Sequence, residues 1–106
     1  MDKYSIVRTD LADDQLRKII LTVAQNFGKE VALKKLDEIE QAVLQLAEFP
    51  YSGAIPHYSV LRRAGYRVLV LERDLVFYKV DEPERKVIIY AITDNRQDYL
   101  SILRGL

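Results

Sequence analysis

The sequence predicts an α+β domain in which a helical hairpin packs on one face of an antiparallel sheet. Apolar residues recur at the three- and four-residue spacing of helices before Pro50, and runs rich in β-branched and aromatic residues follow it. Helical and strand patterns are thus segregated along the chain, as they are in α+β domains. The connections between the expected strands are short, which favours an antiparallel meander.

Residues 3–8 alternate polar and apolar side chains, which predicts a short N-terminal strand. Thr9 or Asp10 then offers an N-cap for a first helix. Asp13 and Asp14 bring negative charge to its first turn, where the helix dipole favours it. The apolar residues that follow lie on one helical face and are Leu16, Ile19, Ile20, Val23, Ala24 and Phe27.

Gly28 is expected to end this helix, because glycine takes the left-handed conformation that a C-cap often requires. A second helix is predicted over residues 29–48, and Phe49 with Pro50 ends it. Its apolar face contains Leu36, Ile39, Val43 and Leu46. The connection between the two helices is so short that they must lie side by side in an antiparallel hairpin.

The second half of the chain is predicted to be a loop followed by strands. The loop spans residues 50–56, which contain two prolines and one glycine. The strands are expected at residues 60–63, 66–71, 75–80 and 86–92, with turns at residues 64–65, 72–74 and 81–84. Several strands are apolar on both faces, so the face opposite the helices must be covered or serve as an interface. Asp98 is expected to cap a short helix over 98–106.

Composition narrows the class of protein. The length of 106 residues fits one domain, 1–106, and 49% hydrophobic with 30% charged residues argues against disorder. Uncharged apolar stretches such as residues 68–71 are far too short for a membrane span, and no signal-peptide h-region is present. With no cysteine and one histidine, we expect no disulfide, no metal and no cofactor. The expected class is a soluble cytoplasmic domain.

The formal net charge of zero hides an uneven distribution of charge. The run from Phe49 to Leu71 carries no carboxylate, and its cationic candidates are His57, Arg62, Arg63 and Arg67. Such a patch suits a phosphate or an acidic partner, while ordinary surface arginines are the alternative interpretation.

No specific catalytic motif is present, since the chain lacks a P-loop, a nucleophile elbow and H-E-x-x-H. Arginines and tyrosines remain, because guanidinium groups clamp phosphates and a phenol or imidazole moves protons. These groups would support metal-independent RNA cleavage at a 2′-hydroxyl. The alternative is that the tyrosines are core or interface residues. The candidates are Arg62, Arg67, Lys79, Arg96, Tyr58, Tyr66, Tyr78, Tyr90 and Tyr99.

Four segments carry a resemblance to a known family. Residues 46–53 are similar to the pattern L-x-x-x-P-x-x-G, and residues 92–98 resemble V-x-H-x-R-R-D, with Asp94 at the histidine and Gln97 at the second arginine. Residues 66–69 and 75–81 lie between them. Their order and spacing over nearly the whole chain resemble the RelE/ParE superfamily of bacterial toxins.

This resemblance implies a toxin neutralised by an antitoxin that is encoded beside it and wraps around it. The superfamily contains ribosome-dependent mRNA endonucleases and inhibitors of DNA gyrase. The nucleases rely on an arginine in the meander, an arginine after the last strand and a C-terminal tyrosine or histidine. The counterpart of the first arginine is Arg67 or Arg73, either one by a shift of register, because its expected place near Val70 is apolar. The counterparts of the other two are Arg96 and Tyr99.

We therefore expect a type II toxin that inhibits gyrase, with a ribosome-dependent endonuclease as the alternative and a small protein-binding adaptor as a further one. The candidates for contact with the target or nucleic acid are Arg62, Arg63, Arg67, His57 and Lys79. The antitoxin is expected to form a hetero-oligomer with the chain by covering an edge of the sheet, or the sheet face around Leu69, Leu71, Phe77 and Ile89.

Overall fold

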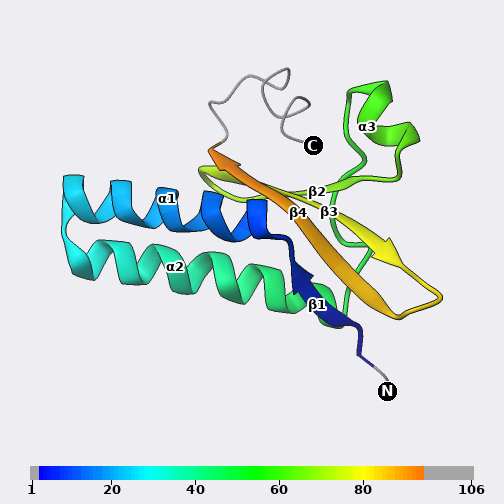
Figure 1. The fold of residues 1–106 in the computed structure, drawn as a ribbon, viewed down its shortest axis with the longest axis horizontal. Coiled ribbons are helices and arrows are strands. Elements are labelled where there is room, and N and C mark those ends of the chain that lie inside the picture. The colour runs from blue at the N-terminus through cyan, green and yellow to red at the C-terminus, as the bar shows by residue number, and fades with distance from the viewer. Residues whose placement is uncertain (1–2, 95–106) are drawn as a thin grey trace.

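A computed structural model describes residues 3–94 of the chain (Figure 1). Its elements in chain order are β1 (Ser5–Arg8), α1 (Asp10–Phe27), α2 (Lys29–Leu44), η1 (Gln45–Ala47), α3 (Ser59–Arg63), β2 (Arg67–Val70), β3 (Asp74–Asp81) and β4 (Lys86–Asp94). The predicted α+β class is confirmed, since α1 and α2 form a hairpin that packs against a four-stranded sheet. None of the described helices is long and apolar enough to cross a membrane.

The helical hairpin begins and turns at the predicted residues. Thr9 is the N-cap of α1, and its Oγ1 accepts the backbone N–H of Ala12 at 3.1 Å. The same hydroxyl donates to the carbonyl of Tyr90 at 3.2 Å, which fixes the start of α1 on β4. Gly28 lies between α1 and α2 with φ +93°, a conformation that glycine adopts without strain.

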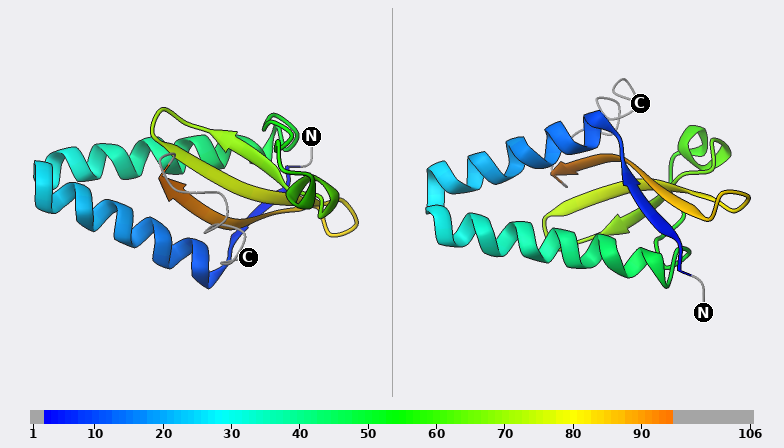
Figure 2. Two further views of the ribbon diagram at one scale, coloured as in Figure 1. Left: turned by 90° about the horizontal axis from the view of Figure 1, so that it is seen from above. Right: turned by 60° about the horizontal axis from the view of Figure 1, so that its bottom comes forward.

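The sheet is mixed, with the strand order β1-β4-β3-β2. Strands β2, β3 and β4 form the expected antiparallel meander, whereas β1 pairs in parallel with β4. A parallel pair needs a long crossover connection, and the chain between β1 and β4 includes both long helices. Figure 2 shows that the end of the hairpin where α1 turns into α2 extends past the sheet.

The prediction of a strand at residues 60–63 is wrong, because these residues belong to α3. Leucine and arginine are good helix formers, and Leu61 places its side chain at 1% exposure against the sheet. Residues 64–65 end α3 and form no hairpin turn. Gly65 has φ +89°, and the backbone N–H of Tyr66 donates to the carbonyl of Leu61 at 3.1 Å.

Other boundaries differ from the predictions by a few residues. The predicted helix 29–48 is divided into α2 and the 3-10 turn η1. Asp74, predicted in a turn, begins β3, and its carbonyl accepts the N–H of Leu71 at 2.9 Å. Strand β4 continues to Asp94. The helix predicted over 98–106 lies outside the described residues.

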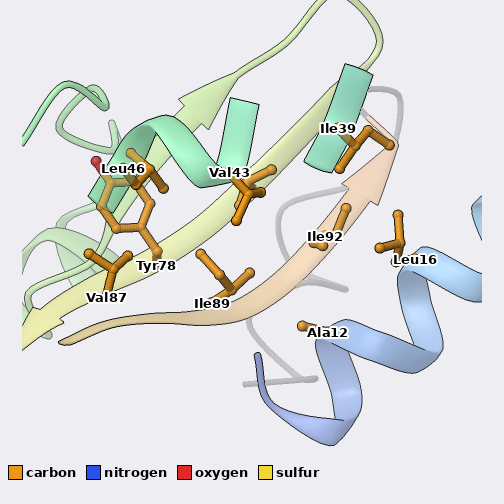
Figure 3. Close-up of a cluster of buried hydrophobic side chains, with 10 residues drawn as sticks. Ala12, Leu16, Ile39, Val43, Leu46, Tyr78, Val87, Ile89 and Ile92 are labelled. Atoms are coloured by element: carbon orange, nitrogen blue, oxygen red, sulfur yellow. The ribbon is translucent and has the colours of Figure 1, made fainter. Parts of the chain in front are cut away.

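Two apolar clusters lie on opposite faces of the sheet. The larger one, between the hairpin and the sheet, contains Ala12, Leu16, Ile39, Val43, Leu46, Val76, Tyr78, Val87, Ile89 and Ile92, and Figure 3 draws it. The smaller one lies on the other face and contains Leu61, Tyr66, Val68, Leu75, Phe77 and Ala91. The face opposite the hairpin is therefore partly covered by the chain itself, through Leu61 of α3.

Candidate functional site

The segment after η1 is held against the sheet by a close approach at Gly53. The backbone N–H of Gly53 donates to the Oη of Tyr78 at 2.9 Å. A Cβ added at Gly53 would lie 2.5 Å from that Oη and 2.9 Å from the carbonyl oxygen of Val68. The segment 46–53, which carries the family resemblance, also has Leu46 and Pro50 buried. The spacing of Leu46, Pro50 and Gly53 in this segment is therefore explained by the burial of all three residues.

Arg67, the first residue of β2, fixes the same loop. Its Nη1 donates to the carbonyl oxygens of Tyr51 at 3.1 Å and of Gly53 at 2.9 Å. Its guanidinium lies 5.0 Å from the centroid of the Tyr51 ring, within the range of a cation–π interaction. Arg67 therefore holds the loop in place through the backbone carbonyl oxygens of Tyr51 and Gly53.

Two tyrosines and two charged residues join β1, this loop and the β3–β4 turn. Tyr4 donates from its hydroxyl to Oε1 of Glu82, and Nη1 of Arg85 donates to the Tyr4 hydroxyl at 3.2 Å. Hydrogen bonds from the Tyr4 and Tyr51 hydroxyls lower the pKa of Glu82. Arg85 also stacks on the Tyr4 ring, 4.2 Å from its centroid. This cluster secures the end of the sheet, and Tyr51 links it to Arg67.

Lys79 lies between two tyrosine rings on the sheet face opposite the hairpin. Its Nζ is 4.4 Å from the ring centroid of Tyr66 and 5.3 Å from that of Tyr90. The two rings meet edge to face, with centroids 5.4 Å apart and an angle of 83° between their planes. Burial is the main reason that the pKa of Tyr66 is raised above its ordinary value. Of the cationic candidates in the described chain, Lys79 is the one that the fold surrounds with aromatic rings.

The other predicted target residues are scattered. Arg62 and Arg63 are exposed in the last turn of α3, where the helix dipole favours positive charge. His57 is exposed in the loop before α3. Arg96 and Tyr99 lie outside the described residues. Among residues 3–94, no group of three or more histidine, aspartate and glutamate side chains is arranged to hold a metal ion.

The four residues predicted to face the antitoxin do not share one face. Ile89 is fully buried under the helical hairpin, and Leu69 and Leu71 pack against the same cluster while half-buried. Phe77 is fully buried in the smaller cluster on the opposite face. Side chains alternate between the faces of a strand, so apolar residues on both faces could not be assigned to one face from the sequence.

The sequence analysis missed an apolar groove between the far end of the hairpin and the β2–β3 turn. Its volume is ≈ 630 Å³, and its apolar lining includes Val23, Phe27, Val31, Ile39 and Leu71. Two of these are exposed although apolar, Phe27 at 66% and Val31 at 48%. The feature of the sequence that could have indicated this groove is the length of the two helices. Because the helices extend past the end of the sheet, their last apolar residues lie beyond it.

An ion pair lies in the wall of this groove. Lys35 Nζ is 2.5 Å from Oδ2 of Asp74, and the side chains are 18% and 4% exposed. A second hollow of ≈ 480 Å³ shares both residues and reaches Asp94 at the end of β4. The pair therefore connects α2 to the start of β3 where the groove opens.

Comparisons with known proteins agree with this fold. The family model described as the ParE toxin of the type II toxin–antitoxin system parDE matches residues 6–99. A chain of the chromosomal ParDE toxin–antitoxin system from P. aeruginosa is similar, with a TM-score of 0.72 and 26% identity over 87% of this chain and 96% of that chain. A chain of the toxin–antitoxin complex RelBE2 from Mycobacterium tuberculosis has a TM-score of 0.66 and 16% identity, over 88% of this chain and 99% of that chain.

The second likeness shows the fold alone, because the identity is low. A search of curated proteins found no match. The family model, in contrast, covers all the described strands and helices except the first residue of β1. The chain therefore belongs to the ParE toxin family of type II toxin–antitoxin systems, within the RelE/ParE superfamily.

Proposed function

We propose that this chain arrests bacterial growth by inhibiting DNA gyrase and that a cognate antitoxin neutralises it. The match to the ParE family supports the gyrase class over the nuclease class. The observation that carries the choice is the engagement of Arg67, whose Nη1 is bonded to two loop carbonyls. Arg67 is one of the two candidates for the meander arginine of the nucleases. Its hydrogen bonds go to the loop, whereas a nuclease would need them on the scissile phosphate.

The charge of the chain supports the same choice. A ribosome-directed nuclease gains affinity by neutralising phosphates, and 16 basic residues balanced by 16 acidic ones provide little long-range attraction to RNA. A protein target such as gyrase does not require that attraction.

The antitoxin is proposed to place apolar side chains in the groove lined by Phe27, Val31 and Leu71. Large exposed apolar patches on a folded chain mark interaction sites. Burying one large apolar side chain completely contributes about 1.5–3 kcal/mol before the costs of association. Of the four residues that the sequence suggested for this contact, Leu71 is the one that lines the groove.

Expression in bacteria tests whether the chain acts as a toxin. Induction of the chain alone should stop growth, and co-expression of the product of the neighbouring gene should restore it. A small adaptor domain would instead accumulate as folded protein without harm to the cells. Harmless accumulation of folded chain would contradict the proposal.

The nuclease alternative is favoured by the carboxylate-free run from Phe49 to Leu71, whose arginines together with Arg96 could hold a scissile phosphate. The integrity of mRNA on translating ribosomes tests it. We expect intact mRNA in the presence of the chain. Cleavage that disappears in Arg96→Ala would replace the gyrase proposal by the nuclease one.

A further inference from the structure

Two irregularities of the backbone bring aromatic rings to Lys79. Gly65, at φ +89°, ends α3 and leads directly into Tyr66. The register between β3 and β4 shifts between Phe77 and Tyr78, so that Tyr90 is the extra residue of a β-bulge. A bulge re-aims the side chain of its extra residue. Here it places Tyr90 on the sheet face that carries Lys79.

Lys79 is stacked on two phenol rings and forms no ion pair with a carboxylate of the described residues. None of the ion pairs among residues 3–94 includes Lys79. Asp81, two residues further along β3, accepts the backbone N–H of Glu84 at 3.2 Å instead. Burial keeps the pKa of Tyr66 above its ordinary value, so this phenol remains protonated. An ammonium group that lies on two phenol rings and forms no ion pair within residues 3–94 is suited to receive an anion.

The residues beside Lys79 indicate what carries that anion. Val7 of β1, Ile88 of β4 and Lys79 of β3 lie in register across three strands, on one face of the sheet. Val7 is 42% exposed and Ile88 is half-buried. This row of two apolar side chains and one cation matches a protein segment that bears a carboxylate next to apolar residues.

A nucleic acid fits this row less well. Single-stranded nucleic acids bind proteins by stacking bases on open aromatic faces. Lys79 lies over a face of each ring, and Tyr66 is only 9% exposed. The zero net charge of the chain adds little attraction for a polyanion.

We propose that Lys79 receives a carboxylate side chain of the antitoxin and that apolar neighbours of this carboxylate pack on Val7 and Ile88. The inference rests on the proposed function, because it takes the antitoxin as the partner. It adds a second contact, on the sheet face opposite the helical hairpin, which an antitoxin that wraps around the chain reaches together with the groove.

Calorimetric titration of the full chain with the product of the neighbouring gene tests the contact. Lys79→Met keeps the stem of the side chain and removes its charge, and it should raise the Kd about 10- to 100-fold. Lys79→Arg keeps the charge and the stacking and should restore most of the affinity. The matched control is Lys86→Met, which removes a charge from the same sheet and should change the Kd less than about threefold. Thermal unfolding of each variant verifies that it is folded.

The partner of Lys79 is identified by a double-mutant cycle. Each Asp or Glu of the antitoxin is changed to Asn or Gln, and one of these changes should weaken binding to the wild-type chain but not to Lys79→Met. An unchanged Kd for folded Lys79→Met, or additive effects for every antitoxin carboxylate, overturns the inference. So does weaker binding of an RNA or DNA oligonucleotide to Lys79→Met at unchanged antitoxin affinity. A wild-type chain that binds no antitoxin contradicts the proposed function itself.

Discussion

At Gly53 the loop after η1 touches the sheet, and no larger residue fits there. The added Cβ of Gly53→Ala would meet the Tyr78 hydroxyl and the carbonyl of Val68. We expect the free energy of unfolding to fall by about 2–4 kcal/mol, because overpacking and loss of the Gly53–Tyr78 hydrogen bond act together. Urea denaturation measures this change in the free energy of unfolding. Ser52→Ala, at the exposed neighbouring position, is the control and should stay within about 0.5 kcal/mol of the parent chain.

The tyrosines make stability depend on alkaline pH. Burial raises the pKa of Tyr66 and of Tyr78 above the ordinary value of 10.0. Between that value and the raised pKa, the folded chain holds phenol protons that the unfolded chain has released. The contribution of these groups is therefore complete below pH 10.0 and is lost as the pH rises through the raised pKa.

The measurement is the urea midpoint from pH 8 to pH 11. Tyr78→Phe should be less stable than the parent at neutral pH, because the N–H of Gly53 loses its acceptor. It should also lose less stability with rising pH, since one buried phenol no longer titrates. An equal slope in both proteins would show that Tyr78 does not contribute to the pH dependence.

At the scale of elements, the buried ion pair connects α2 to β3. Lys35→Met leaves the carboxylate of Asp74, 4% exposed, without its partner. We expect this change to lower the free energy of unfolding by about 3–5 kcal/mol. Asp74→Asn should cost less, because Lys35 has a long stem and reaches water more easily.

The double variant Lys35→Met/Asp74→Asn completes this test, because it leaves no uncompensated charge. It should be more stable than Lys35→Met alone. Equal stability of Lys35→Met and the parent chain in urea would contradict the assignment of the pair as a structural connection. The same measurement on the parent chain, both single variants and the double variant gives the coupling between the two side chains.

The elements that were predicted well from the sequence are those with an apolar pattern repeated over many residues, a clear capping residue or short turns. Thr9 and Gly28 mark the ends of α1 by local chemistry alone, and the meander follows from short turns. Residues 60–63 were predicted wrongly because four residues are too few to distinguish the two periods. What decides their conformation is a tertiary contact, the burial of Leu61 against the sheet.

At the scale of the molecule, the superfamily could be predicted from the sequence. Which residues lie on each face of the sheet and around the groove could not. Which side chains share a face depends on the bulge at Tyr90, and how much of that face is covered depends on the tertiary contact of Leu61 in α3. Phe77 and Ile89 were therefore expected on an open face and are buried on opposite faces. The groove at Phe27 arises from the length of the hairpin relative to the sheet, which only the assembled fold determines.

Inhibition of gyrase is the central claim, and supercoiling by purified gyrase tests it most directly. The folded chain is titrated into a reaction that converts relaxed circular DNA to the supercoiled form, and the fraction converted is measured on a gel. We expect conversion to fall as the chain is added and to return when the product of the neighbouring gene is added in excess. Full conversion at a saturating amount of a chain that arrests growth in cells would contradict the account.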